Sequence, residues 1–264
     1  MKFSMYQMDI HPGNPVENRK RVAGWIDMEV ERANPDTIVL PEMWTTAYTL
    51  SALNELADKE GEPTKSFLQE LAVKHNINII GGSVANKVEG KIYNSAIIVN
   101  RDGRIVYQYD KVHLVPMLDE PKYLSGGVKP AEIFELDGIK VGLIICYDLR
   151  FPELIRWLAL EGAQALIIVA EWPLARVGHW RTLQMARAIE NQMYVLSCNR
   201  VGSYNDVRFA GTSMVTDPWG EVYVEGTQDE EETFSFELDL EKVKKARRDV
   251  PIFSSRVPEL YKQK

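Results

Sequence analysis

Hydrophobic and polar positions follow two alternating patterns along the first two thirds of the chain. Short runs of aliphatic and β-branched residues predict buried strands, whereas longer stretches with apolar residues three or four positions apart predict amphipathic helices. The predicted strands cover residues 3–8, 37–40, 77–85, 92–100, 105–109, 139–146, 165–170 and 193–198. The predicted helices cover residues 17–33, 63–75, 152–161 and 180–191, and Thr64 is the expected N-cap of the second. This alternation is typical of an α/β protein.

The pattern changes in the last third, where short strands follow one another without long helices between them. We expect strands over residues 212–216, 221–225 and 233–238, then a charged helix over residues 240–248. Residues 249–264 are expected to form a largely unpacked C-terminal tail. Because the chain contains neither a low-complexity linker nor a short-period repeat, residues 1–264 are predicted to form a single domain.

Charge and hydropathy argue against several classes of protein. The 264 residues include 31 Lys and Arg against 38 Asp and Glu, a net charge of −7, so no basic excess predicts binding to nucleic acid or anionic lipid. The longest apolar runs, residues 141–146 and 165–170, are far shorter than the roughly 20 residues that a membrane-spanning helix requires. The N-terminal segment reaches Asp9 before any apolar stretch of a signal peptide. We therefore expect a soluble cytoplasmic protein.

The chain has two cysteines, Cys146 and Cys198, and four scattered histidines. These residues fit neither a disulfide framework nor a zinc-binding motif, so we expect reduced thiols and no metal. Cys198, on a predicted buried strand, is expected to be a core residue.

Three side chains with complementary chemistry stand where predicted strands end. Glu42 follows residues 37–40, Lys111 follows residues 105–109, and Cys146 ends residues 139–146. The carboxyl ends of strands are where α/β proteins assemble their sites. Alone, Cys146 reads more readily as an inert core residue, and Glu42 and Lys111 as a solvated acid and a surface cation. A thiol, a base and a cation sharing one type of location favour a catalytic site.

The sequences around these side chains resemble one known family. They are LPEMW at residues 40–44, YDKVHL at residues 109–114 and GLIICYDLRFPE at residues 142–153. All three, in this order, resemble the nitrilase superfamily of carbon–nitrogen hydrolases over essentially the whole chain. The resemblance implies one carbon–nitrogen hydrolase domain folded as a four-layer α-β-β-α sandwich, a homodimer or higher homo-oligomer, and neither a metal nor an organic cofactor.

The resemblance also assigns roles to residues. It implies a triad of Glu42, Lys111 and Cys146, and a further glutamate between the lysine and cysteine motifs, for which Glu120 is the matching position beside Asp119. In the expected mechanism Glu42 takes the proton of the Cys146 thiol, which attacks an amide carbonyl. Lys111 and the backbone N–H of Tyr147 stabilise the oxyanion, and a water activated by the glutamate pair hydrolyses the thioester.

Within the superfamily the chain is most similar to the ω-amidase branch. The resemblance is carried by residues 172–173, 176, 179–180, 186–195, 198–202, 250–253 and 260–261. It implies hydrolysis of the terminal amide of 2-oxoglutaramate and 2-oxosuccinamate, small-molecule substrates that carry a carboxylate. A site for such substrates needs a cationic side chain that binds this carboxylate.

Several side chains near the predicted site are candidates for substrate binding. Arg176 is the first candidate for the substrate carboxylate and Arg150 the second, although Arg150 could instead tie down the backbone through Glu153. Trp172 is a further candidate. Tyr48 could line the pocket or merely pack there.

Four other residues are expected to have structural roles. Arg187 and Glu190, three positions apart on one helix, are expected to form a salt bridge. His113 and His179 could orient Lys111 or a loop.

Two other functions remain open. The chain could have another specificity within the superfamily, namely aliphatic nitriles, N-carbamoyl compounds or a broader range of amides. It could also be a catalytically silent binding or scaffold module. The intact Glu42, Lys111 and Cys146 favour an enzyme, because a binding module has no chemical need for all three at strand ends.

Overall fold

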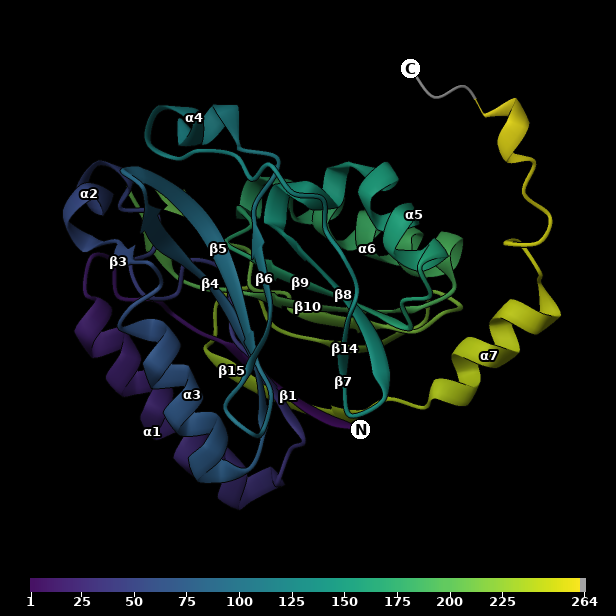
Figure 1. The fold of residues 1–264 in the computed structure, drawn as a ribbon, viewed down its shortest axis with the longest axis horizontal. Coiled ribbons are helices and arrows are strands. Elements are labelled where there is room, and N and C mark those ends of the chain that lie inside the picture. Colours follow the sequence, from purple (N-terminus) through teal and green to yellow (C-terminus); the bar gives the residue numbers. More distant parts are fainter. Residues whose placement is uncertain (262–264) are drawn as a thin grey trace.

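The computed structural model describes residues 1–261 and contains two β-sheets that pack face to face between two pairs of helices (Figure 1). The first sheet has the order β15-β1-β2-β4-β5-β6, with β3 paired to β4, and the second has the order β14-β13-β10-β9-β8-β7. The first sheet comprises β1 (Lys2–Gln7), β2 (Thr37–Val39), β3 (Asp58–Lys59), β4 (Asn78–Val88), β5 (Lys91–Val99), β6 (Ile105–Asp110) and β15 (Glu232–Glu237). The second comprises β7 (Phe134–Leu136), β8 (Ile139–Ile145), β9 (Ala165–Ala170), β10 (Tyr194–Asn199), β13 (Met214–Thr216) and β14 (Val222–Glu225).

Helices cover the outer face of each sheet. In Figure 1, α1 and α3 lie on one side of the molecule and α5 and α6 on the other. The helices are α1 (Pro15–Ala33), α2 (Leu53–Leu56), α3 (Thr64–His75), α4 (Glu120–Tyr123), α5 (Pro152–Leu160), α6 (Val177–Asn191) and α7 (Leu240–Asp249). Short 3-10 helices are η1 (Leu50–Ala52), η2 (Pro116–Leu118), η3 (Cys146–Arg150), η4 (Leu174–Arg176) and η5 (Pro258–Leu260), and a small hairpin joins β11 (Ser203–Tyr204) to β12 (Val207–Arg208).

Alternating side chains explain why the layers stack. Along β2, Val39 belongs to the core between the two sheets, whereas Ile38 packs on the opposite face with α1 and α3. The core between the sheets also contains Met5 of β1 and Leu143 of β8, all fully buried. The expected four-layer α-β-β-α sandwich is confirmed.

Three local expectations differ from the structure. Thr64 is not an N-cap: it is the first residue of α3, Pro63 holds the N-cap position, and no side chain caps that end. α1 begins at Pro15, two residues early, because Asn14 accepts a hydrogen bond from the backbone N–H of Glu17 and proline suits the first turn. α6 begins at Val177 rather than residue 180.

The C-terminal segment after α7 runs along the side of the molecule (Figure 1). Most of its side chains are exposed, but Phe253 packs against the core and Arg247 stacks over its ring at 5.2 Å. Residues 262–264 of the expected tail lie outside the described residues. No helix within residues 1–261 has the length and apolar character needed to cross a membrane.

Candidate active site

Glu42, Lys111 and Cys146 converge at the edge of the sandwich, and all three are buried. Glu42 follows β2, Lys111 follows β6, and Cys146 follows β8. The Lys111 ammonium lies 2.9 Å from Glu42 Oε1 and 2.8 Å from Glu120 Oε1. The structure therefore brings together the cation and both glutamates expected from the sequence.

Glu42 is held by donors from four different parts of the chain. Its Oε1 accepts hydrogen bonds from Lys111, from the Tyr48 hydroxyl at 2.8 Å and from Asn94 Nδ2 at 2.8 Å. Its Oε2 accepts the backbone N–H of Glu171 at 2.7 Å. Such a carboxylate has little freedom to rotate, so its oxygens are fixed relative to Cys146.

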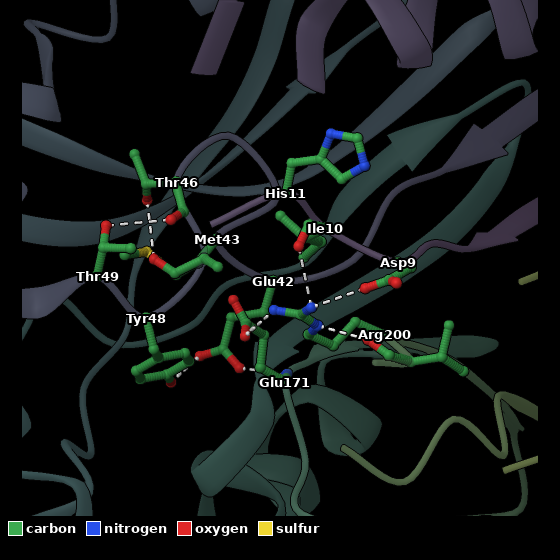
Figure 2. Close-up of polar contacts among 12 residues, drawn as sticks. Asp9, Ile10, His11, Glu42, Met43, Thr46, Tyr48, Thr49, Glu171 and Arg200 are labelled. Atoms are coloured by element: carbon green, nitrogen blue, oxygen red, sulfur yellow. Dashed lines mark hydrogen bonds and ion pairs between the residues drawn. The ribbon is translucent and has the colours of Figure 1, made fainter. Parts of the chain in front are cut away.

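Glu120, rather than Asp119, completes this cluster. Glu120 Oε2 accepts the backbone N–H of Val115 at 2.7 Å, while Oε1 accepts from Lys111 and shares the single proton of the Tyr48 hydroxyl with Glu42 Oε1. Asp119 is instead exposed and pairs with Lys122 at 2.9 Å. Tyr48 thus bridges the two glutamates through its hydroxyl, as Figure 2 shows for Glu42, which is a more specific position than a general pocket lining.

Cys146 is the first residue of η3, in a strained turn directly after β8. Its φ is 47°, in the left-handed region that costs a residue other than glycine about 1–3 kcal/mol. Asp148 stabilises this turn, because its carboxylate accepts the backbone N–H of Ile145 at 3.1 Å and the Tyr109 hydroxyl at 2.9 Å. It also bonds to both the backbone N–H and the ring of His113. His113 therefore orients the loop after Lys111 and, through Asp148, the nucleophile turn.

A pocket opens beside Cys146, and three of the four substrate-binding candidates line it, whereas Tyr48 is not among its lining residues. Its walls include Cys146, Tyr147, Arg150, Glu171, Trp172 and Arg176. The Arg150 guanidinium stacks over the Trp172 ring at 4.7 Å and lies 3.4 Å from His179 Nδ1. No hydrogen bond or ion pair joins Arg150 to Glu153 within residues 1–261, so the proposed tie through Glu153 is wrong. Trp172 Nε1 donates to the backbone carbonyl of Arg176 at 2.9 Å.

The comparisons with known proteins agree with this geometry. The family model described as carbon-nitrogen hydrolase matches residues 3–248. This chain belongs to the carbon-nitrogen hydrolase family. It is 45% identical to a 2-oxoglutaramate amidase of Bacillus subtilis (strain 168), over 98% of both chains. It is 32% identical to the omega-amidase NIT2 of Bos taurus, over 93% of this chain and 91% of that protein.

A solved structure supports the same assignment. The crystal structure of Saccharomyces cerevisiae Nit3, described as a member of branch 10 of the nitrilase superfamily, superposes with a TM-score of 0.89 at 30% identity, over 96% of this chain and 94% of that one. The resemblance to the nitrilase superfamily is confirmed. This carbon-nitrogen hydrolase acts on carbon–nitrogen bonds other than peptide bonds.

Burial and charge set the resting protonation of the site. Burial, followed by the charge of Glu42, raises the pKa of the Cys146 thiol well above its ordinary value, although Lys111 opposes this shift. The resting hydrolase therefore holds a neutral thiol. Burial alone would lower the pKa of Lys111, but the charges of Glu120 and Glu42 outweigh it and raise that pKa, so Lys111 stays a cation.

Two further expectations are met away from the pocket. Arg187 pairs with Glu190 at 2.9 Å and donates to the backbone carbonyl of Leu149 at 3.0 Å, which links α6 to the nucleophile turn. Cys198 is fully buried in the core, where its thiol donates to the backbone carbonyl of Tyr6 at 3.2 Å.

Sequence reasoning missed four buried residues at the site: Asn94, Asp148, Glu171 and Arg200. Glu171 and Arg200 carried a usable signal, since each follows a predicted buried strand, as the triad residues do. No group of three or more His, Cys, Asp or Glu side chains in the described part of the chain is arranged to hold a metal ion. The expectation that the hydrolase needs neither metal nor cofactor stays a prediction.

Proposed function

We propose that this hydrolase cleaves the terminal amide of a small 2-oxo acid amide, 2-oxoglutaramate or 2-oxosuccinamate, to a carboxylate and ammonia. The observation that carries the proposal is the pair of cations in the pocket of Cys146. Arg150 and Arg176 both line that pocket, and neither forms an ion pair with a carboxylate within residues 1–261. A free guanidinium matches the geometry of a substrate carboxylate. The similarity to the amidase of Bacillus subtilis supports the same substrate class.

In the proposed reaction Cys146 is the nucleophile and Glu42 the general base. Glu42 takes the thiol proton as sulfur attacks the amide carbonyl, which forms the carbon–sulfur bond. Because the resting thiol is neutral, this transfer accompanies the attack rather than preceding it. Glu42 then returns the proton to the departing nitrogen as the carbon–nitrogen bond breaks, and ammonia and a thioester result.

The oxyanion and the second half-reaction use the remaining residues. We assign oxyanion binding to Lys111 and to the backbone N–H of Tyr147, the residue after the nucleophile; losing one such donor typically costs about 2.7–4 kcal/mol of barrier. A water, activated by Glu42 with Glu120 beside it, attacks the thioester and releases the carboxylate and the Cys146 thiol. Tyr48 and Asn94 hold Glu42 in place during both steps, which their hydrogen bonds support.

Ammonia release from three substrate classes tests the proposed function. The purified protein is given 2-oxoglutaramate, an aliphatic nitrile and an N-carbamoyl amino acid, and kcat/KM is compared. The expected result is the highest value for 2-oxoglutaramate. A higher value for either of the other two would replace the proposed specificity with that one, and no release from any of them at high enzyme concentration would favour a binding module.

Arg176→Ala is expected to raise KM for 2-oxoglutaramate by about tenfold to hundredfold, because a charge-assisted hydrogen bond contributes about 1.5–3 kcal/mol. KM for a neutral amide, such as butyramide, should change less than threefold. The matched control is Arg181→Ala in α6, the helix that follows Arg176; Arg181 is exposed and pairs with Glu225 at 2.9 Å. Equal effects of Arg176→Ala on both substrates would remove Arg176 from the carboxylate site and leave Arg150.

We further propose that the hydrolase is a cytoplasmic homodimer or larger homo-oligomer that binds neither nucleic acid nor membranes. Both cysteines are unpaired, which suits a reducing compartment. Large apolar side chains are exposed on α5, on α6 and near the C-terminus: Trp157, Ile189 and Tyr261. Such residues are typical of subunit contacts. Light scattering that gave only the 30.1 kDa of one chain would contradict the oligomer.

A further inference from the structure

Glu171 is a buried acid at the end of β9 that the proposed reaction does not use. Its backbone N–H donates to Glu42, and its side chain points to Arg200 (Figure 2). Glu171 Oε2 lies 3.1 Å from an Arg200 nitrogen. The Arg200 guanidinium is fixed in turn by Asp9 Oδ1 and by the backbone carbonyl of Ile10, each at 3.1 Å. One oxygen of Glu171 is therefore rigidly anchored.

The other oxygen of Glu171 has no partner. Oε1 is fully buried and makes no hydrogen bond in the described part of the chain, although Glu171 lines the same pocket as Cys146, Arg150 and Arg176. A buried polar atom without a partner is costly, and such atoms in folded proteins usually pair with something. An unpaired oxygen on a side chain that belongs to the lining of a reactive pocket is thus a candidate for contact with the bound substrate.

The surroundings of Glu171 decide whether this oxygen donates or accepts. Burial, and then the charge of Glu42, raises the pKa of Glu171 to about 8 against the opposing charges of Arg200 and Lys111. The charged and titratable groups that face it come from several elements: Asp9 after β1, Glu42 after β2, Lys111 after β6, Cys146 after β8, Arg200 after β10, and Arg150 and Arg176 across the pocket. At neutral pH the carboxyl is mainly neutral and can donate a hydrogen bond.

We propose that the free oxygen of Glu171 donates a hydrogen bond to the 2-oxo group of the substrate, so that Glu171 selects 2-oxo acid amides over amides that lack this group. This inference rests on the proposed function. It assigns a partner to the 2-oxo oxygen, the one substrate oxygen for which the proposed function names none. The amide oxygen goes to Lys111 and the Tyr147 N–H, and the carboxylate goes to Arg176 or Arg150. The ketone oxygen only accepts hydrogen bonds, so it requires a donor, and a neutral carboxyl supplies one.

A matched pair of substrates tests this role. 2-Oxosuccinamate and succinamate differ only in the 2-oxo group, and the ratio of their kcat/KM values isolates its recognition. The wild-type hydrolase is expected to prefer 2-oxosuccinamate by about tenfold to hundredfold. Glu171→Met, which cannot donate, should reduce this preference to less than threefold. Glu171→Gln, whose amide donates, should keep most of it.

The control variant is Asp9→Asn, which alters the other carboxylate on Arg200 at the same distance but lies outside the pocket. It should leave the preference unchanged. Alkylation of Cys146 by iodoacetamide at the wild-type rate in each variant would show that the site is intact. If Asp9→Asn lost the preference as Glu171→Met does, Glu171 would act through Arg200 rather than on the substrate, and the inference would be wrong.

The pH profile gives a readout that a structural role would not move. In the wild type the preference for 2-oxosuccinamate should fall as pH rises through about 8, because ionised Glu171 cannot donate. Glu171→Gln should show no such fall. If the wild-type hydrolase releases ammonia from neither 2-oxoglutaramate nor 2-oxosuccinamate, the proposed function is wrong and this inference with it. If it hydrolyses both, but its preference for 2-oxosuccinamate over succinamate does not depend on Glu171, this inference alone is wrong.

Discussion

Cys146→Ala is expected to abolish amide hydrolysis and to leave the fold intact. The variant removes the nucleophile, and losses on the order of 10⁴-fold or more follow when an enzyme loses such a group. It removes a single sulfur atom and keeps a side chain that tolerates the φ of 47° no worse than cysteine does, so the free energy of unfolding should change by less than about 1 kcal/mol. Ammonia release and thermal melting followed by circular dichroism measure the two quantities.

The matched control is Cys198→Ala, which removes the same atom from the core between the sheets. Cys198 is fully buried and is not among the residues that line the pocket, so its loss should destabilise the protein by roughly 1–2 kcal/mol and leave kcat near the wild-type value. Cys146→Ala should therefore lose activity and keep stability, whereas Cys198→Ala should lose stability and keep activity. Measurable turnover by Cys146→Ala, verified as free of wild-type protein, would rule out the thioester mechanism.

Lys111→Met is expected to reduce both activity and stability strongly. The substitution leaves Glu42 and Glu120 buried together, each bonded to Tyr48, without the cation that separates their charges. Breaking a buried ion pair by removing one partner costs about 3–5 kcal/mol. The loss of an oxyanion donor adds about 10²- to 10³-fold in kcat, before any displacement of Glu42 is counted.

The stability loss of Lys111→Met should depend on pH in a defined direction. One of two carboxylates that share a site tends to take up a proton, which can replace the missing charge. The destabilisation relative to the wild type should therefore shrink as pH falls from about 8 to about 5. The control is Lys122→Met, which breaks the exposed pair with Asp119 at 2.9 Å and should change stability by less than about 0.5 kcal/mol at any of these pH values. Equal destabilisation by the two variants would contradict the buried-cluster account.

Hydrophobic patterning predicted that Glu42, Lys111 and Cys146 each stand at a strand end, and the resemblance to the nitrilase superfamily implied that they form a triad. Glu42, Lys111 and Cys146 follow apolar runs whose length and β-branched content identify strands without any knowledge of tertiary contacts. The same alternation predicted most of the individual strands and helices and the α/β class, whereas the arrangement in two sheets with helices outside them was implied by the resemblance to the nitrilase superfamily.

Other features depend on contacts between distant segments and left no local signal. Tyr48 reaches both glutamates because the loop after β2 folds back through left-handed residues at Met43 and Ala47, a path that no periodicity encodes. Asn94 and Asp148 act through hydrogen bonds across 52 and 39 positions of sequence, to Glu42 and to Tyr109.

Thr64 was misassigned because its residue type suits a cap, whereas the cap position belongs to Pro63.

The carboxylate of Asp148 joins the two sheets of the sandwich. It belongs to the turn after β8, yet it binds Tyr109 of β6 and His113 beyond that strand. Cys146 thus follows a strand of the second sheet, whereas Glu42 and Lys111 follow strands of the first. Asp148 holds the two sheets together at this point. A shift of one sheet relative to the other would separate the Cys146 sulfur from Glu42 without unfolding any strand or helix. On gradual heating, turnover should therefore be lost before the far-ultraviolet ellipticity declines. Loss of activity would then report a change in the relative position of the two sheets.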